Sequence, residues 1–368
     1  MALRVLIACG GTGGHLFPGV AVAEELRRRG HEPLLLVSRK EIDKTALAGR
    51  GHLPSRALPA VGWPGLSLRL FRFAAQLWQA RGACRALFAE VRPDVVLGMG
   101  GFTSAVPAWE AKRRRVPSLI HESNAVPGRV TRLMAKWADR TLLGFAACAP
   151  HLAPARCEVT GTPVRAELVR LPKDEAARVL GLDPAFAGKT LLVIGGSQGA
   201  RGVNRLFAAA APLLAGDGLR FVHQTGKDDE AAVAAAYAKA GVRAVVKAFL
   251  DGAGMAAAYS LADLAVARSG ASSLTELGHY GLPSILIPFP AAADDHQTAN
   301  ARVFEEAGAA RLRPQGALTA EEIAATVRNL LSEAGRTELD AMAKAAAGLS
   351  VPDAAARVAN EVESCAKK

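Results

Sequence analysis

The same pattern occurs three times in this chain: a short apolar run, then a cluster of glycines, then a segment typical of a helix. This repetition strongly limits the folds that the chain can adopt. The glycine clusters lie at residues 10–14, 98–101 and 195–199, each directly after a short apolar run. Such runs are typical of strands that are buried on both faces, and helices follow them in α/β folds. The pattern therefore predicts an α/β protein whose parallel sheets are covered by helices on both sides.

Each half of the chain carries its own series of predicted strands. They are expected at residues 4–8, 34–37, 94–97 and 118–120, and then at 190–194, 219–222, 244–248, 264–267 and 284–287. Two series predict two doubly wound, Rossmann-like domains, divided near Gly161-Thr162-Pro163. We expect the ligand crevice at the carboxyl ends of the strands, between the two domains. The helix after the first glycine cluster is expected to begin near Pro18 and to end at Gly30.

Composition excludes several other classes of protein. Half of the 368 residues are hydrophobic and 21% are charged, which is typical of a globular chain. No uncharged apolar run reaches the roughly 18–20 residues of a membrane-spanning helix, and the apolar stretch near the N-terminus is too short for a signal peptide. The five cysteines show no CxxC spacing, so we expect reduced cytosolic thiols, with neither a disulfide framework nor a zinc site.

The excess positive charge is confined to the first part of the chain. Residues 1–160 contain 23 Lys and Arg against 11 Asp and Glu, whereas residues 161–368 contain 22 against 23. This asymmetry indicates an anionic partner, which could be a nucleic acid, an acidic membrane surface or a phosphorylated substrate. An arginine-rich composition without a partner is the alternative interpretation.

Three glycine clusters in equivalent places favour phosphate binding over plain tight turns. Backbone N–H groups at a helix N-terminus bind phosphate, and glycine allows close approach to them. The dinucleotide fingerprint GxGxxG is broken, because Leu16 takes the third glycine position of the first cluster and Ser197 the second position of the third cluster. NAD is therefore disfavoured.

Two other nucleotide motifs also fail. The strand at residues 34–37 is followed by Arg39 and Lys40 and lacks the acid that binds an NAD ribose, which leaves NADP formally open. The triplet at residues 188–190 imitates the end of a P-loop, but Asp183 takes the required first glycine position and the triplet precedes its strand. No ATPase motif is predicted.

The motifs, taken in order, resemble those of the peptidoglycan N-acetylglucosaminyltransferase (MurG) family. The three glycine clusters carry the resemblance first: GGTGGH-x-x-PG at 10–19, GMGGF at 98–102 and GGSQGA at 195–200. The other matching stretches are HESN at 121–124, TGTPVR at 160–165, RSGA at 268–271, GLP at 281–283 and DHQTANA at 295–301. Two departures stand out: the loop at residues 249–255 is two residues longer than is typical, and Phe102 replaces a frequent Tyr.

The resemblance implies a GT-B enzyme that transfers N-acetylglucosamine from UDP-GlcNAc to the muramoyl 4-hydroxyl of a polyprenyl-diphosphate intermediate, lipid I. The product is lipid II, with inversion at the anomeric carbon. It implies residues 1–161 with a C-terminal helix of about 350–368 as the acceptor and membrane-associating domain, and residues 162–349 as the UDP-sugar domain. The expected location is peripheral, on the cytoplasmic face of the inner membrane. No cofactor and no nucleic acid are expected, and protein partners in cell-wall synthesis are not readable from the sequence.

His15 is the candidate general base, because an inverting transfer needs the acceptor hydroxyl deprotonated and a neutral imidazole can accept that proton. It could instead only hydrogen-bond backbone or substrate. Glu122 is the weaker candidate base or a structural hydrogen-bond partner, and Asn124 matches a substrate-contacting position. The loop positions implied to contact the acceptor diphosphate and sugar are Gly11, Thr12, Gly13, Gly14, Gly100 and Gly101.

In the donor half, the resemblance implies that Arg165 and Ser197 contact the UDP diphosphate, although Arg165 could instead form a hinge salt bridge. Glu276 is implied to accept from the ribose diol, and Gln297 to read the donor sugar. The remaining implied donor contacts are Leu250, Ala271, Ser272, Ser273, Leu274 and Thr275. We expect no metal, because the consecutive side chains of residues 294–296 seldom converge on one ion.

Residues 66–85 predict an amphipathic helix at an anionic membrane surface, with a buried core helix as the alternative. Its apolar face comprises Leu66, Leu70, Phe71, Phe73, Leu77 and Trp78, and its polar stripe Arg69, Arg72, Gln76 and Gln79. The basic run at residues 112–115 would add attraction to anionic lipid, at about 1 kcal/mol per basic residue.

Three other functions remain open at this level. One is a GT-B glycosyltransferase with a diacylglycerol acceptor, and another is an NADP-dependent oxidoreductase, which the broken fingerprints disfavour. The third is a nonenzymatic basic membrane adaptor, which would have no use for three phosphate loops.

Overall fold

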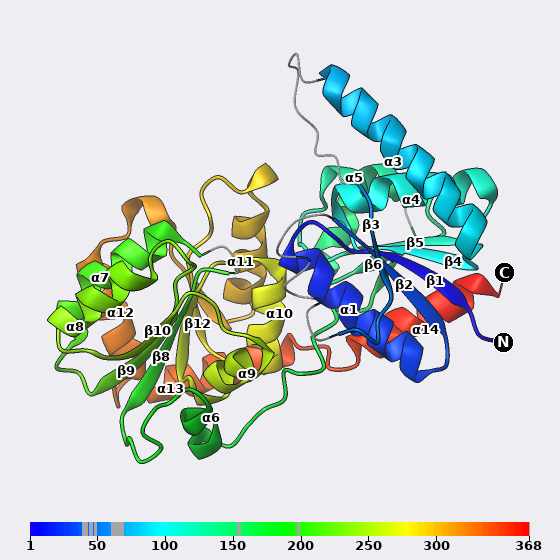
Figure 1. The fold of residues 1–368 in the computed structure, drawn as a ribbon. Helices are drawn as coiled ribbons and strands as arrows, with labels where there is room; N and C mark the ends of the chain where they lie inside the picture. Colours follow the sequence, from blue (N-terminus) through cyan, green and yellow to red (C-terminus); the bar gives the residue numbers. More distant parts are fainter. Residues whose placement is uncertain are drawn as a thin grey trace. The chain divides into compact units, whose positions relative to one another are not determined.

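The structure is a computed structural model. It describes residues 1–38, 43, 47, 50–59, 70–152, 156–196 and 199–367, with the side chains of residues 70–73 outside that description. The chain forms two compact units (Figure 1). Unit 1 comprises Met1–Arg165 and Val351–Lys368, and unit 2 comprises Ala166–Ser350.

Unit 1 is built on a seven-stranded sheet in the order β3-β2-β1-β4-β5-β6-β7, with every pair parallel. Its strands are β1 (Arg4–Ala8), β2 (Glu32–Val37), β3 (Ser55–Ala57), β4 (Val95–Gly98), β5 (Ser118–Glu122), β6 (Arg140–Leu143) and β7 (Cys157–Val159). The strand order reverses between β1 and β4, and open parallel sheets bind ligands at such a switch point. The first two glycine loops follow these two strands.

Helices cover both faces of this sheet because side chains alternate along each strand. On β1, Val5 and Ile7 pack with α1 (Gly13–Arg28) and α14 (Ala354–Ala366), whereas Leu6 and Ala8 pack with α3 (Leu70–Val91) and α4 (Gly101–Arg114). Short helical segments α5 (Arg129–Met134) and η1 (Ala146–Leu152) complete the unit. The apolar run at residues 4–8 is thus buried on both sides, as its composition predicts.

The C-terminal helix α14 lies beside α1 in unit 1 (Figure 1). Val358 and Val362 enter the same core cluster as Leu16 and Val20 of α1. Arg29, directly after α1, donates to Glu363 (3.1 Å). The end of the chain is therefore an integral part of unit 1.

Unit 2 repeats the architecture with a six-stranded parallel sheet in the order β10-β9-β8-β11-β12-β13. Its strands are β8 (Lys189–Ile194), β9 (Leu219–Gln224), β10 (Arg243–Lys247), β11 (Leu264–Ala267), β12 (Ser284–Leu286) and β13 (Ala310–Leu312). Its helices are α6 (Lys173–Val179), α7 (Arg201–Leu214), α8 (Glu230–Lys239), α9 (Gly252–Leu261), α10 (Ala271–His279), α11 (His296–Glu306), α12 (Ala320–Leu331) and α13 (Arg336–Gly348), with short turns η2 (Ala293–Asp295) and η3 (Gln315–Ala317). The switch point lies between β8 and β11.

The predicted fold class, two doubly wound parallel-sheet domains, is confirmed. Three local expectations differ from the structure. Helix α1 begins at Gly13, so Pro18 lies inside the helix rather than in its first turn. Helix α3 runs on to Val91, beyond the expected end at Arg85. Arg165, expected in the donor half, belongs to unit 1, because the units divide directly after it.

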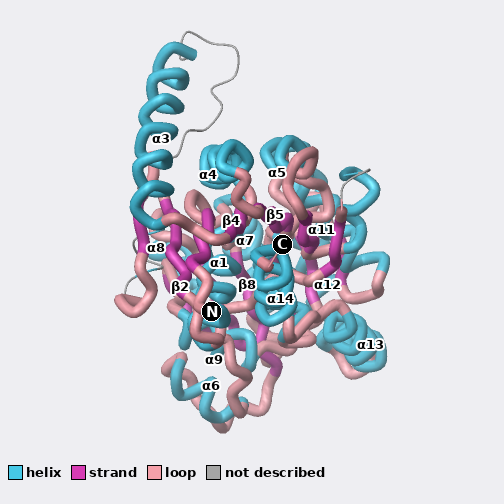
Figure 2. The backbone as a smooth tube through the Cα atoms, turned by 90° about the vertical axis from the view of Figure 1, so that its right-hand side faces the viewer, coloured by secondary structure: helices cyan, strands magenta, loops and turns pink. Residues whose placement is uncertain are grey.

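Helix α3 is anchored only along its C-terminal part. Cys84, Leu87 and Phe88 enter the core with β1 and β4, and the N-terminal part extends past α4 and away from the sheet of unit 1 (Figures 1 and 2). Among residues 74–79, all side chains are exposed except the partly buried Leu77, and Trp78 is 77% exposed. For these residues, the buried-core-helix alternative is wrong.

Candidate active site

The first glycine loop turns the chain from β1 into α1 without room for larger side chains. A Cβ on Gly10 would lie 2.2 Å from the backbone nitrogen of Ser38, and Gly11 has a φ of +111°, which disfavours other residues. The first turn of α1 includes Gly13 and Gly14, and the amides of a first turn point toward a ligand at the helix N-terminus. The loop therefore has the geometry of an anion site.

The buried carboxylate of Asp43 holds the first glycine loop in place. Asp43, fully buried, accepts from the Gly11 N–H (3.1 Å) and from both the backbone N–H (2.7 Å) and hydroxyl (2.5 Å) of Ser38. The Gly11 N–H therefore donates to a side chain of the protein, whereas the sequence predicted that Gly11 contacts the acceptor diphosphate. No motif in the sequence marks Asp43.

His15 lies in the first turn of α1, against the second glycine loop. A Cβ on Gly100 would lie 3.3 Å from the imidazole, and one on Gly101 would lie 3.0 Å from it. Both glycines have positive φ, +89° and +68°. The backbone of the second loop therefore packs directly on the ring, and the sequence-predicted residues of the two loops come together around His15.

The hydroxyl of Thr12 lies 3.1 Å from Nδ1 of His15. When Nδ1 carries the proton and donates to this hydroxyl, Nε2 presents the lone pair that a general base requires. This contact favours one orientation of a half-buried ring. The arrangement can deprotonate an acceptor hydroxyl that lies near Nε2.

Glu122 has the environment of a structural carboxylate. Buried at the end of β5, it accepts from the backbone N–H (3.1 Å) and side-chain amide (2.8 Å) of Asn124. It also accepts from the Gly128 N–H (3.0 Å) and the Thr131 hydroxyl (2.6 Å). These four bonds hold the turn that carries Asn124, which supports the structural interpretation over a role as base.

His121, the residue before Glu122, is fully buried, and its Nε2 lies 2.9 Å from the carbonyl oxygen of Gly161. Burial lowers the pKa of this imidazole, so it stays neutral near pH 7. Its neutral Nε2–H donates to that carbonyl and ties β5 to the end of the first unit's sheet. Sequence reasoning did not single out this residue.

Arg165 is buried, and its guanidinium lies 4.3 Å from the centre of the Phe17 ring on α1. A cation over an aromatic face is stabilised by the ring's quadrupole. The expected diphosphate-binding arginine is therefore placed next to the helix that carries His15.

In unit 2, the third glycine loop is also sterically restricted. A Cβ on Gly199, whose φ is +74°, would lie 2.1 Å from the carbonyl oxygen of Thr225, and one on Gly195 would lie 2.5 Å from the Ala200 nitrogen. Ser197, the predicted diphosphate donor, lies outside the described residues.

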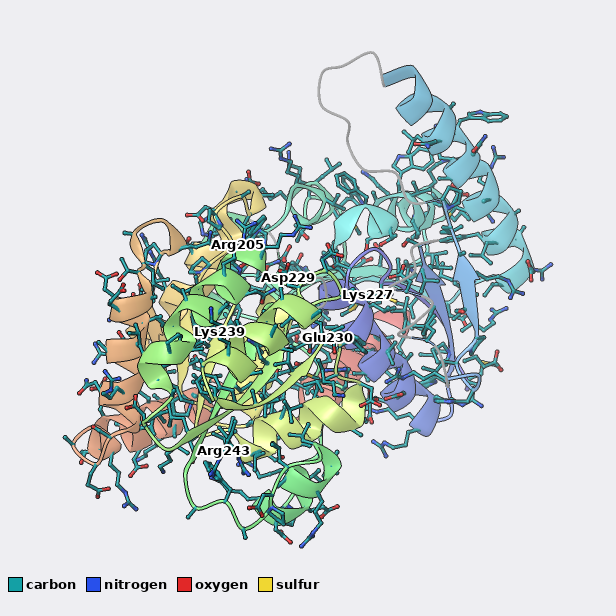
Figure 3. The ribbon with its side chains drawn as sticks, turned by 60° about the vertical axis from the view of Figure 1, so that its left-hand side comes forward. Arg205, Lys227, Asp229, Glu230, Lys239 and Arg243 are labelled. Atoms are coloured by element: carbon teal, nitrogen blue, oxygen red, sulfur yellow. The ribbon has the colours of Figure 1, made fainter. Side chains whose placement is uncertain are left out.

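A buried polar network supports the loop that follows β9. His223 lies 2.8 Å from the Tyr237 hydroxyl and 3.1 Å from the side-chain oxygen of Asn204. Asn204 donates to the Thr225 carbonyl (2.9 Å) and to Asp229 (2.7 Å), the residue directly before α8, which is labelled in Figure 3. Burial lowers the pKa of His223 to about 3, so the network holds a neutral imidazole.

Helix α10 carries five predicted donor contacts, Ala271, Ser272, Ser273, Leu274 and Thr275, in its first turns, after Gly270 at the N-cap. Its first helical bond runs from the Leu274 N–H to the Gly270 carbonyl (3.1 Å). The helix N-terminus favours negative charge. Glu276 follows, buried, and accepts from the Tyr259 hydroxyl on α9 (2.8 Å).

Gln297 is the second residue of α11, and its side chain bonds to the loop after β12. Its side-chain oxygen accepts from the Phe289 N–H (2.9 Å), and its carbonyl accepts from the Ser269 hydroxyl (2.8 Å). Buried Arg268 donates to the Ile287 and Pro288 carbonyls (2.9 and 2.8 Å), and burial lowers the pKa of its guanidinium. The RSGA stretch therefore holds the loop that contacts Gln297.

The longer loop before α9 forms the start of that helix. Asp251 is its N-cap, and the side-chain oxygen accepts from the Gly254 N–H (2.8 Å). Leu250, the predicted base contact, is buried with 7% exposure, whereas Phe249 is exposed.

Among the residues that the structure describes, no group of three or more His, Cys, Asp or Glu side chains could hold a metal ion.

The two doubly wound domains have GT-B architecture, and the family matches define the class of the protein as a glycosyltransferase. The N-terminal domain of glycosyltransferase family 28 matches residues 5–143, and the C-terminal domain of that family matches residues 190–358. Structural likeness agrees: MurG of Acinetobacter baumannii is 27% identical, covers 98% of this chain and 99% of its own, and has a TM-score of 0.76. A putative UDP-N-acetylglucosamine 2-epimerase of Listeria monocytogenes shares the fold at 16% identity, 99% and 96% coverage and a TM-score of 0.71.

Named relatives define the family more narrowly than the fold does. The UDP-N-acetylglucosamine--N-acetylmuramyl-(pentapeptide) pyrophosphoryl-undecaprenol N-acetylglucosamine transferase of Bordetella parapertussis is 40% identical over 100% of this chain and 99% of its own length. The enzyme of the same name from Alkalilimnicola ehrlichii is 41% identical over 98% of each chain. The chain belongs to this family, the peptidoglycan N-acetylglucosaminyltransferases known as MurG.

Proposed function

We propose that this protein transfers N-acetylglucosamine from UDP-GlcNAc to the muramoyl 4-hydroxyl of lipid I, giving lipid II with inversion. The supporting observation is the match to enzymes of that name along essentially the whole chain. The alignment with these enzymes includes the residues around His15 and those around Glu276. The similarity therefore covers both the proposed acceptor site and the proposed donor site.

The two units divide the reaction. Unit 1 holds the acceptor through the loops around His15, and its excess of basic residues suits an acceptor with a diphosphate. Unit 2 holds the donor: the N-terminus of α10 faces the donor phosphates, Glu276 accepts from the ribose diol, and Gln297 reads the sugar. Leu250 contacts the uracil through its backbone, and Ser197 contributes to the diphosphate site.

The chemical step is a single displacement. The acceptor oxygen forms a bond to the anomeric carbon from the face opposite the diphosphate, and the bond from that carbon to the diphosphate oxygen breaks. The hydroxyl proton passes to Nε2 of His15, and UDP leaves with the electron pair of the broken bond. The α10 N-terminus and Arg165 stabilise the charge that develops on the diphosphate. Asn124, fixed by Glu122, contacts the acceptor.

Helix α3 is the proposed membrane contact. Its exposed N-terminal part presents Trp78, an aromatic residue of the kind that anchors proteins in the bilayer interface. Nearby, Arg81 and Arg113 lie 4.2 and 5.2 Å from the ring centre of Trp109, which gathers two cations on the surface formed by α3 and α4. Leu66 and Arg69 lie outside the described residues, as do the side chains of Leu70, Arg72 and Phe73.

No helix within the described residues is long and apolar enough to cross a membrane. From the family and the exposed part of α3, we propose that the protein binds the cytoplasmic face of the inner membrane peripherally, where its proposed lipid acceptor resides. Two of the four basic residues at 112–115 already pair with a buried carboxylate, since Arg113 and Arg114 donate to Glu110 (3.2 and 2.7 Å). In this proposal, the attraction to anionic lipid comes mainly from the other basic residues among residues 1–160.

A metal-free thermal-shift panel tests the donor half first. UDP-GlcNAc, UDP-glucose, UDP, NADPH and ATP are each added, since a ligand that binds only the folded state adds about 2.7 kcal/mol of stability at one hundred times its Kd. We expect shifts with UDP-GlcNAc and UDP. A shift with NADPH and none with UDP would overturn the proposed function and favour the oxidoreductase alternative.

A further inference from the structure

Two tyrosines pack behind Glu276 in unit 2. Tyr259, on α9, is 2% exposed, and its ring stacks on that of Tyr280 with centroids 5.1 Å apart and an interplanar angle of 27°. The backbone carbonyl of Tyr280 accepts from Arg170 (2.6 Å), and the Arg170 guanidinium lies 5.5 Å from the Tyr280 ring centre. The Tyr259 ring is therefore buried and held by stacking on Tyr280.

The hydroxyl of Tyr259 points at the carboxylate. It donates to Oε2 of Glu276 over 2.8 Å, in a part of unit 2 where both side chains are buried. A hydrogen bond to a charged acceptor is stronger than a neutral one, and low local polarity strengthens it further. Because the ring is fixed by stacking, this bond sets the rotation of the carboxylate plane as well as its position.

We infer that Tyr259 is a positioning residue that orients Glu276 so that its carboxylate accepts from both hydroxyls of the ribose diol. This inference rests on the proposed donor function of Glu276. A vicinal diol offers two donors at a fixed spacing, so a carboxylate binds both only when its plane is correctly turned. A carboxylate free to rotate would lose entropy on binding and would distinguish a ribose from a deoxyribose less sharply.

The inference separates two roles that a buried tyrosine could have. A purely structural tyrosine would affect stability and leave the preference for a ribose unchanged. A positioning tyrosine affects that preference specifically, because only the 2′-hydroxyl distinguishes UDP from 2′-deoxy-UDP. Tyr259→Phe keeps the stacked ring and removes only the hydroxyl, which suits this separation.

The test measures the Kd of UDP and of 2′-deoxy-UDP by calorimetry on the full chain. The variants are Tyr259→Phe, Glu276→Gln, and Tyr237→Phe as the matched control. Tyr237 is another buried tyrosine of unit 2, and its hydroxyl bonds to His223 rather than to Glu276. Melting temperatures confirm that each variant is folded.

The wild type should prefer UDP about tenfold, as expected when a charged hydrogen bond is lost with the 2′-hydroxyl. Glu276→Gln should reduce this preference, Tyr259→Phe should reduce it to about two- to threefold, and Tyr237→Phe should retain it. An unchanged preference in folded Tyr259→Phe overturns the inference and leaves the donor function intact. Failure of the wild type to bind UDP at all would instead overturn the donor function itself.

Discussion

Among single residues, His15 is the proposed proton acceptor of the transfer. Replacing it with Gln should lower kcat by about 10²–10³-fold, because proton acceptance by a positioned base contributes on that order. The KM for UDP-GlcNAc should change little, since His15 lies in the acceptor unit. Steady-state kinetics measure both effects.

Glu122→Gln provides the contrast. The four hydrogen bonds to its carboxylate predict a loss of stability, because an amide cannot accept from all four donors. If this variant lost its chemical step while His15→Gln kept it, the assignment of the base would be wrong.

The glycine at position 101 gives a second prediction at this scale. Gly101→Ala should lower kcat about tenfold, because the new Cβ would lie 3.0 Å from the His15 ring and must displace it. Gly181→Ala is a matched control: Gly181 has the same φ of +68° and nothing within 4 Å of its Cβ position. Equal activity of the two variants would show that packing on His15 does not matter for catalysis.

Sequence reasoning found the residues that lie in motifs and missed those that support them. His15 and the glycine loops stand out in the local sequence, whereas Glu276 was singled out only through the family resemblance. The bond between Asp43 and Gly11 spans 32 positions and that between Tyr259 and Glu276 spans 17, and only the folded chain brings these residues together. The structural role of Glu122 also became visible only when its four donors were placed.

At the scale of elements, α3 carries the membrane prediction. Trp78→Ala should weaken binding to anionic vesicles several-fold, because the exposed indole loses its place in the interface. The triple change Arg69→Glu, Arg72→Glu and Arg113→Glu should weaken it further by charge repulsion. Vesicle sedimentation measures both, and unchanged binding would remove α3 from the membrane contact.

A buried histidine gives a stability prediction for β9 and its neighbouring helices. The pKa of His223 is about 3 in the folded chain and close to 6.5 when exposed, so the unfolded state binds the extra proton first. Stability from this group is therefore complete above about pH 6.5 and is lost as the pH falls, by about 1.4 kcal/mol per pH unit. Urea unfolding at pH 7 and pH 5 should show a smaller pH effect in His223→Gln than in the wild type. An identical pH effect would mean that His223 is not buried neutral.

The elements themselves were largely predictable from the sequence. The structure contains a strand at each predicted place, and the longest apolar runs, such as Val5–Ala8 and Leu191–Ile194, form inner strands of the two sheets. Four strands were not predicted, because none of them contains more than two consecutive hydrophobic residues: β3, β6, β7 and β13. Helix α1 starts before Pro18 because the glycine loop feeds straight into the helix, and this start places His15 on a rigid element.

At the scale of the whole molecule, the uneven charge should make membrane binding sensitive to salt. Residues 1–160 carry the entire excess of Lys and Arg, and attraction to anionic lipid is screened over about 8 Å at physiological ionic strength. Binding to vesicles with anionic lipid should weaken when the salt concentration rises, whereas the Kd for UDP should change less. Salt-independent vesicle binding would mean that apolar contacts alone hold the protein at the membrane.

The most direct test of the central claim is product formation from defined substrates. The purified chain is incubated without added metal with labelled UDP-GlcNAc and vesicles that contain either lipid I or diacylglycerol. We expect label only in the lipid I reaction, in a lipid II product with a β-linked N-acetylglucosamine on the muramoyl 4-oxygen. Transfer to diacylglycerol, or no transfer to lipid I by protein that binds UDP, would contradict the account.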